Sequence, residues 1–254
     1  MRKCLFCENP AKTREHIWPE WVLKRLNVRE PIHQKMGNEP AQLLPNPEQK
    51  VKAVCGTCNN GWMHELENLN IPLIGNLMQD VAFALNGLQQ YQLATWAVKM
   101  SMIGDFLARS QRPLFFDQVE REQLRVANNL PDRTQVWIAR YAFPDHVGIW
   151  GTNSWALDMT VHAFITTVVV GHLVVQVLTA QCFEKWDGIK VNVEPRPGPL
   201  PWPQLVTGIW PTVVSAAWPP TFSFNDDTEF SVFRVIRRFS YGEDLLSKAA
   251  RSSD

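Results

Sequence analysis

Four of the five cysteines of this 254-residue chain fall in two pairs with the same spacing. The pairs are Cys4-x2-Cys7 and Cys55-x2-Cys58, while Cys182 stands alone in an apolar stretch. A two-residue spacer lets both thiolates of a pair point at one ion, and Zn²⁺ with four sulfur ligands forms a closed structural site. The sequence therefore predicts one Zn²⁺ bound by the four paired cysteines, with Cys182 as a core residue.

A second group of reactive side chains lies between the two pairs and directly after them. Glu15 and His16 precede Pro19, and Asn59 follows Cys58. An imidazole that titrates near neutrality can deprotonate water at cellular pH. A carboxylate and an amide oxygen suit a hard divalent ion such as Mg²⁺ or Mn²⁺, which offsets charge on a phosphoryl group under attack. These residue types fit metal-assisted hydrolysis of a phosphodiester.

The segment Thr13-x-Glu15-His16-Ile17-x-Pro19, together with Cys58-Asn59, resembles the HNH endonuclease family, which has the ββα-metal fold. The family pattern has an acidic residue and a histidine that close a strand, an Asn or His that starts the helix, and in many members two zinc-binding knuckles. The resemblance covers about residues 1–70. It implies that His16 is the general base and that Glu15 and Asn59 bind a catalytic Mg²⁺ or Mn²⁺ ion.

One position departs from the family pattern. The family's middle Asn, which orients the catalytic histidine, lies shortly before the second knuckle, and Lys50 occupies that place here. Either Gln49, Asn46 or a backbone carbonyl orients His16 instead, or catalysis is slow or altered. Lys50 and Lys52 fall on one face of a strand and are candidates for contacts with nucleic-acid phosphates.

Two further titratable residues follow Asn59 on the expected helix. At roughly 100° per residue, a regular helix places His64 about 140° from Asn59 and Glu67 about 80° away. We therefore expect His64 to point away from the site, whereas Glu67 can approach it. Asn59 can also cap its helix, which does not prevent it from binding an ion.

The elements that must position these residues are short. The sequence predicts a strand over 11–17, a helix over 19–26, a proline-rich loop over 28–50 and a strand over 51–54. A helix is expected to begin at Asn59 and to end before Pro72, because proline lacks the N–H that a helix interior needs. A zinc ion in the knuckles would pin the first strand against the start of this helix and bring Glu15, His16 and Asn59 together.

The rest of the chain has a different composition, rich in tryptophan and valine. The patterns predict a helix over 91–108, strands over 135–142, 147–155 and 230–236, a hairpin over 164–179 that turns at Gly171-His172, and an extended connector over 195–203. The predicted fold class is α+β. A small zinc-stapled ββα-metal module over 1–78 precedes a mainly β domain over 79–254 with a covering helix, which selects the target or binds a partner.

The overall charge is balanced, with 25 basic and 25 acidic side chains, so the chain is not a polycation that coats nucleic acid. Residues 1–60 still carry ten Lys and Arg against six Glu, a local surplus of four. The first residues contain no apolar leader, and the apolar span 161–180 is interrupted by polar residues. We therefore expect a cytoplasmic protein without a membrane segment, whose oligomeric state the sequence does not determine.

The leading functional hypothesis is a divalent-metal-dependent endonuclease of bacterial or phage type that cleaves DNA, with RNA as the other substrate class. The resemblance associates such enzymes with mobile elements, restriction and anti-phage defence. The alternative is a non-catalytic zinc module that binds nucleic acid or a protein partner, and Lys50 at the middle position keeps it open. In a third reading the β domain senses a small molecule, but no glycine-rich phosphate loop supports it.

Overall fold

The computed structural model describes residues 2–27, 50–107, 113–144, 147–156, 161–182 and 205–225, together with short strands at 32–34, 42–44, 192–194 and 238–240. In these short strands, and at 150, 152–156, 161 and 182, only the backbone is described. Helices and strands are both present, as the predicted α+β class requires.

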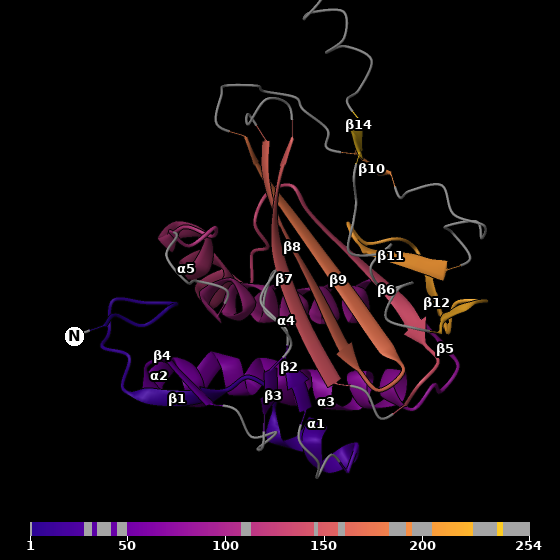
Figure 1. Cartoon of the computed structure of the whole chain (residues 1–254), viewed down its shortest axis with the longest axis horizontal. Helices are drawn as coiled ribbons and strands as arrows, with labels where there is room; N and C mark the ends of the chain where they lie inside the picture. The colour runs from indigo at the N-terminus through magenta and orange to yellow at the C-terminus, as the bar shows by residue number, and fades with distance from the viewer. Residues whose placement is uncertain are drawn as a thin grey trace, which may run out of the picture.

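The N-terminal part consists of a two-stranded ribbon followed by an interrupted helix (Figure 1). β1 (Thr13–His16) pairs antiparallel with β4 (Lys50–Val54), and α1 (Glu20–Arg25) follows β1 in the chain. After β4 the chain passes through α2 (Gly56–Cys58) and a π-helical turn, η1 (Asn59–Met63), into α3 (His64–Met78). The two predicted strands, the first helix and a helical segment from Asn59 onwards are thereby confirmed.

Two predictions for this part are wrong. β2 (Ile32–Gln34) and β3 (Gln42–Leu44) pair as an antiparallel hairpin within the segment predicted as loop. In addition, α3 continues through Pro72. Beyond this proline the helix buries Leu73, Ile74 and Leu77 in the core. Burial of such side chains contributes roughly 1.5–3 kcal/mol each, which offsets the roughly 3 kcal/mol that a proline costs inside a helix.

A long central helix packs on a six-stranded sheet (Figure 1). The helix α4 (Gly87–Leu107) contacts this sheet and also α3, and most of its side chains are buried. The sheet has the order β11-β6-β9-β8-β7, and β13 pairs parallel with β6. Its strands are β6 (Thr134–Tyr141), β7 (Val147–Ala156), β8 (Val161–Val170), β9 (Leu173–Cys182), β11 (Val206–Trp210) and β13 (Ser223–Phe224).

The hairpin of β8 and β9 confirms the prediction for the most apolar stretch of the chain. Its turn contains Gly171, whose φ of +58° lies in the left-handed region that glycine adopts without strain. Among the described residues, no helix is long and apolar enough to cross a membrane.

The remaining elements lie around this centre. β5 (Phe83–Leu85) pairs with β12 (Ala216–Trp218), and β10 (Asn192–Glu194) pairs with β14 (Arg238–Ser240). α5 (Gln118–Ala127) begins at a capping box formed by Asp117 and Glu120. The strand predicted over 230–236 and the connector predicted over 195–203 lie outside the described residues.

One hydrophobic core joins the two predicted parts of the chain. Its buried side chains run from Phe6 in the first knuckle through Leu77 and Trp96 to Trp218. The boundary near residue 78 therefore does not separate two cores, and independent folding of each part stays a prediction.

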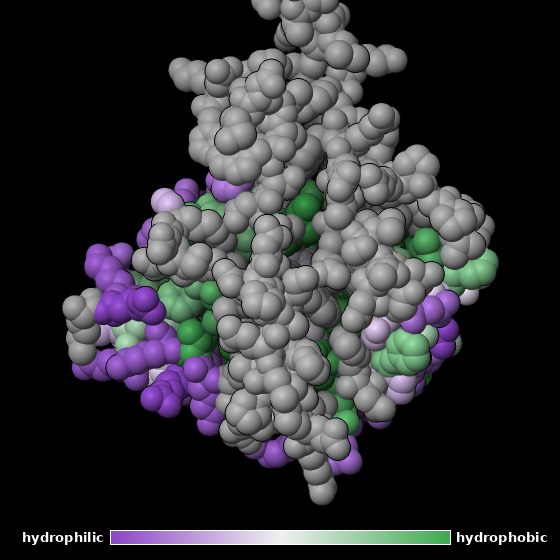
Figure 2. Space-filling view, in the orientation of Figure 1, coloured by the Kyte–Doolittle hydropathy of each residue, from purple (hydrophilic) through white to green (hydrophobic). Residues whose placement is uncertain are grey.

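In Figure 2, hydrophilic side chains gather on the left flank, where Figure 1 places the N-terminal segment and α5.

Candidate functional site

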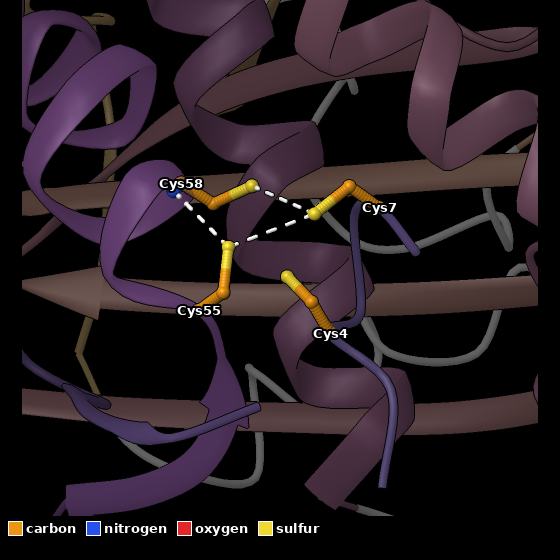
Figure 3. A group of neighbouring side chains, drawn as sticks. All are labelled: Cys4, Cys7, Cys55 and Cys58. Atoms are coloured by element: carbon orange, nitrogen blue, oxygen red, sulfur yellow. Dashed lines mark hydrogen bonds between the residues drawn. The ribbon is translucent and has the colours of Figure 1, made fainter. Parts of the chain in front are cut away.

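The four paired cysteines converge on one point, two from the chain ahead of β1 and two from the corner between β4 and α2 (Figure 3). Their sulfur atoms all lie within 4.8 Å of one another. The Cys7 Sγ lies 3.6 Å from both the Cys55 Sγ and the Cys58 Sγ. With Zn–S bonds of about 2.3 Å, the edges of a ZnS₄ tetrahedron measure about 3.8 Å. The cluster can therefore hold a metal ion such as zinc.

The surroundings of the cluster also suit thiolate ligands. The four side chains are buried. The Phe6 N–H donates a hydrogen bond to the Cys4 Sγ at 3.5 Å, and the Cys58 N–H donates one to the Cys55 Sγ at 3.4 Å. The pKa of Cys4 is lowered to about 5, mainly because the Cys58 thiol hydrogen-bonds to it. Burial is the main cause that raises the pKa of Cys7. Without a metal ion the group therefore favours a thiolate at Cys4, whereas the pKa of Cys7 and that of Cys58 are raised, the latter mainly by its hydrogen bond to Cys4.

Two arginines of α5 hold the first knuckle from outside. Arg121 Nε donates to the Leu5 carbonyl at 2.7 Å, and Arg125 Nε donates to the Phe6 carbonyl at 3.0 Å. Arg121 is buried and also donates to the Phe116 carbonyl. Because both acceptors lie between Cys4 and Cys7, a helix from the later part of the chain fixes the backbone that carries two of the four thiols.

We predict that Arg121→Met speeds the loss of zinc to a chelator by about tenfold, because hydrogen bonds behind metal ligands typically contribute 10–100-fold to metal affinity. Release is followed with a chromogenic chelator on zinc-loaded protein. The exposed Arg133 provides a matched control, and Arg133→Met should release zinc at the wild-type rate. Equal release from both variants would contradict a role for α5 in the centre.

The β1–β4 ribbon positions Glu15 and His16 on its two opposite faces. Glu15 lies opposite Val51 and His16 lies opposite Lys50 in the antiparallel register. Since neighbouring residues of a strand point to opposite sides, Glu15 is buried whereas His16 is half-buried. Lys50 and Lys52 are exposed on β4, and Lys50 is the cross-strand neighbour of His16. Gln49 and Asn46, the predicted alternatives for orienting His16, lie outside the described residues.

The predicted catalytic residues line one cavity of about 490 Å³ beside the cysteine cluster. It is walled by β1, α1, η1 and the first turns of α3. Glu15, His16 and Asn59 contribute to this wall, and so do His64 and Glu67. Glu20 lines the cavity as well, and lies close enough to His16 for their charges to interact. The structure thus brings together the three residues predicted as base and ligands, and their roles stay predictions.

The expectation that His64 points away from the cavity is wrong. It assumed a regular helix, but the helical segment is kinked at Gly61, which has non-helical angles, φ −99° and ψ −116°. The kink changes the orientation of the following residues, so His64 lines the same cavity as Asn59. His64 Nε2 lies 2.9 Å from Asn68 Nδ2, one turn further along α3. The glycine inside the helical pattern is the signal in the sequence that pointed to this interruption.

Glu15 has the most perturbed carboxyl group of the cavity. Its pKa is raised to about 7, mainly by burial, while Lys99 opposes the rise and Glu67 adds to it. Lys99 belongs to α4 and donates to Glu67 Oε1 at 2.7 Å. In the described part of the chain, no hydrogen bond reaches the Glu15 carboxylate, although only 6% of the residue is exposed. A buried carboxylate without a donor is a ready ligand for a cation.

We predict that Glu15→Gln stabilises the metal-free protein at pH 8. Because the folded-state pKa of about 7 exceeds the ordinary value of 4.5, the contribution of Glu15 to stability is complete below pH 4.5 and is lost as pH rises through 7. The cost to the wild type at pH 8 is at most about 3 kcal/mol, and glutamine removes it. Thermal melts without added divalent ions should show a Tm several degrees higher for Glu15→Gln at pH 8 and little difference near pH 5.

The exposed Glu65 is the control for this measurement, and Glu65→Gln should leave the Tm unchanged at both pH values. If Glu15→Gln lowers the Tm at pH 8, the carboxylate has a stabilising partner and the cavity does not hold it as an uncompensated charge.

No family model, curated protein or solved structure matches this chain.

Proposed function

We propose that this protein is a divalent-metal-dependent endonuclease that hydrolyses phosphodiester bonds in DNA and carries a structural zinc ion in its four-cysteine cluster. The observation that carries the proposal is one cavity lined by Glu15, His16 and Asn59, the last of which directly follows Cys58 in the chain. These residues come from β1 and η1, which are separated in the sequence by the second cysteine pair.

The residues of the cavity fit a hard divalent ion. Mg²⁺ and Mn²⁺ prefer oxygen ligands and retain water where the protein supplies few of them. Glu15 offers a buried carboxylate without a hydrogen-bond donor, and Asn59 offers an amide oxygen on the same wall. A bound ion would supply positive charge against the phosphoryl and leaving oxygens.

Other residues of the cavity and of the adjacent strand act as the general base and contact the substrate. His16, half-buried at the cavity wall, accepts the proton of the attacking water. Glu20 lines the same cavity and lies within the range of charge interaction with His16. Lys50 and Lys52, exposed on the adjacent strand, contact the phosphates of the substrate strand.

A second candidate function is a non-catalytic zinc module that binds nucleic acid or a protein partner. The observation in its favour is Lys50, which lies opposite His16 where the resembled family has the asparagine that orients the histidine. A lysine cannot accept the hydrogen bond from an imidazole N–H, so a base role for His16 then depends on another partner.

Nicking of a supercoiled plasmid tests the proposal. Zinc-loaded protein should nick the plasmid after addition of Mg²⁺ or Mn²⁺ and should be inactive without it, while a parallel reaction with a single-stranded RNA distinguishes the two substrate classes. Protein that binds the plasmid but never cuts it supports the second candidate. Cleavage at the same rate with and without added divalent ion contradicts the proposed mechanism.

A further inference from the structure

The cavity wall carries a second carboxylate, Glu67, whose buried partner Lys99 lies behind it, and the proposed reaction uses neither of these two residues. Lys99 Nζ lies 2.7 Å from Glu67 Oε1, and the Lys99 side chain is 1% exposed. Glu67 lines the cavity together with Glu15. Lys99 also interacts electrostatically with Glu15, so one ammonium group serves two carboxylates.

The charges of Glu15, Glu67 and Lys99 do not balance. With both carboxylates ionised, they and the one ammonium group carry a net charge of −1, while Glu15 is 6% and the Glu67 side chain 18% exposed. Lys99 occupies one oxygen of Glu67, and in the described part of the chain nothing binds Glu67 Oε2 or the Glu15 carboxylate. Two carboxylate oxygens that face one cavity without donors attract a cation, because burial makes an unpaired charge costly.

Lys99 contacts the cavity residue Glu67 from outside the HNH-like segment. It lies in α4, which begins at Gly87, and its neighbours in the helix are buried in the core. Since α4 packs against α3, the lysine and Glu67 meet across the contact between these two helices. A lysine buried in a core and paired with one partly buried glutamate costs more in desolvation than a surface pair, which argues for a function at this point.

We propose that Glu67 is a second carboxylate ligand of the divalent-ion site beside Glu15, and that Lys99 provides the counter-charge of the site while no ion is bound. The inference rests on the proposed function for the identity of the ion, but it concerns ion binding and not cleavage. It implies that the site is completed by a residue of α4 and is not contained in residues 1–78.

Binding of Mn²⁺ to the full-length, zinc-loaded protein tests the proposal without any nucleic acid. The free ion is measured by electron paramagnetic resonance during a titration, and the Tm is measured with and without Mn²⁺. Three variants are compared with the wild type: Glu67→Gln, Lys99→Met and the control Glu65→Gln. Glu65 is exposed on the same helix and does not line the cavity.

The two test variants should shift the Mn²⁺ affinity in opposite directions. Glu67→Gln should raise the dissociation constant about tenfold or more, because it removes a ligand. Lys99→Met should lower the Tm of the metal-free protein but bind Mn²⁺ several-fold more tightly, because the positive charge that opposes the ion is gone. Mn²⁺ should therefore raise the Tm of Lys99→Met by more than it raises that of the wild type. Glu65→Gln should match the wild type in both measurements.

Three results would overturn the inference. The first is a wild-type protein that binds no Mn²⁺, and the second is a Glu67→Gln variant with wild-type affinity. The third is a Lys99→Met variant whose Tm rises with Mn²⁺ by no more than the Tm of the wild type, which is the result expected if the lysine is purely structural. If Lys99→Met does not fold, Glu67→Gln/Lys99→Met removes both partners and should bind Mn²⁺ more tightly than Glu67→Gln alone. A wild type that binds Mn²⁺ as expected but cuts no plasmid leaves this inference standing and rejects the proposed nuclease function.

Discussion

Cys55→Ser is expected to abolish zinc binding and to unfold at least the N-terminal part of the protein. Structural zinc bound by thiolates contributes roughly 10–16 kcal/mol in small modules, which is comparable to the whole stability of a typical domain at about 5–15 kcal/mol. The Cys55 sulfur lies 3.6 Å from the Cys7 sulfur and accepts a hydrogen bond from the Cys58 N–H, so it belongs to the centre of the cluster. A serine hydroxyl is a poor substitute, because Zn²⁺ favours thiolate sulfur.

The damage is expected to spread beyond the knuckles. The cysteines are part of the same core as Phe6 and Trp96, and Phe6 packs edge-to-face on Trp62 with the ring centroids 4.9 Å apart. Loss of the metal would therefore loosen the packing of α3 on α4 and lower the Tm of the whole chain.

Metal analysis and thermal melts measure both effects. The wild type should contain one zinc per chain, and Cys55→Ser should contain none and melt well below it. Cys182→Ser makes the same change at the fifth cysteine, outside the four-cysteine group, and should retain the zinc. Wild-type protein that is folded and free of zinc would contradict the structural-zinc proposal.

His16→Ala is expected to remove most plasmid nicking while it leaves the zinc content, the Tm and the affinity for DNA almost unchanged. A positioned general base typically contributes about 10²–10⁴-fold to the rate, so the loss should be plain in the nicking assay. His16 is half-buried at the cavity wall, and in the described part of the chain its ring forms no hydrogen bond that the substitution would break.

The divalent-ion ligands should behave differently from the base. Glu15→Ala and Asn59→Ala should also slow nicking, but a higher concentration of Mg²⁺ or Mn²⁺ should partly restore their activity, because the defect lies in ion binding. The same increase should not rescue His16→Ala.

His172→Ala is the matched control, since this histidine lies at the β8–β9 turn, where its ring binds the Tyr141 carbonyl, and is not part of the cavity wall. It should retain wild-type nicking. Unchanged nicking by His16→Ala would exclude the histidine as the base and leave the zinc centre as the main surviving part of the HNH interpretation.

Much of the local structure follows from short patterns in the sequence. The spacing of the four paired cysteines predicted the cluster, because a two-residue spacer suffices to aim two thiols at one point. The apolar hairpin was predicted with its turn at Gly171, because glycine readily adopts the positive φ of that turn. Each of these signals depends on residues that are close together in the chain, so neighbouring side chains and backbone angles decide the outcome.

The tertiary structure decided the features that depend on distant partners. Pro72 lies inside a helix because the residues beyond it are buried in the core, and His64 lines the cavity because the helical segment is kinked at Gly61. The pairing of Lys99 with Glu67 and the contact of Arg121 with the first knuckle join segments that no local pattern connects. Such contacts arise only when buried surfaces select one packing of the whole chain. The cysteine spacing and the Glu-His segment could therefore be recognised in the sequence, whereas the buried charged groups behind the cavity and the first knuckle could not.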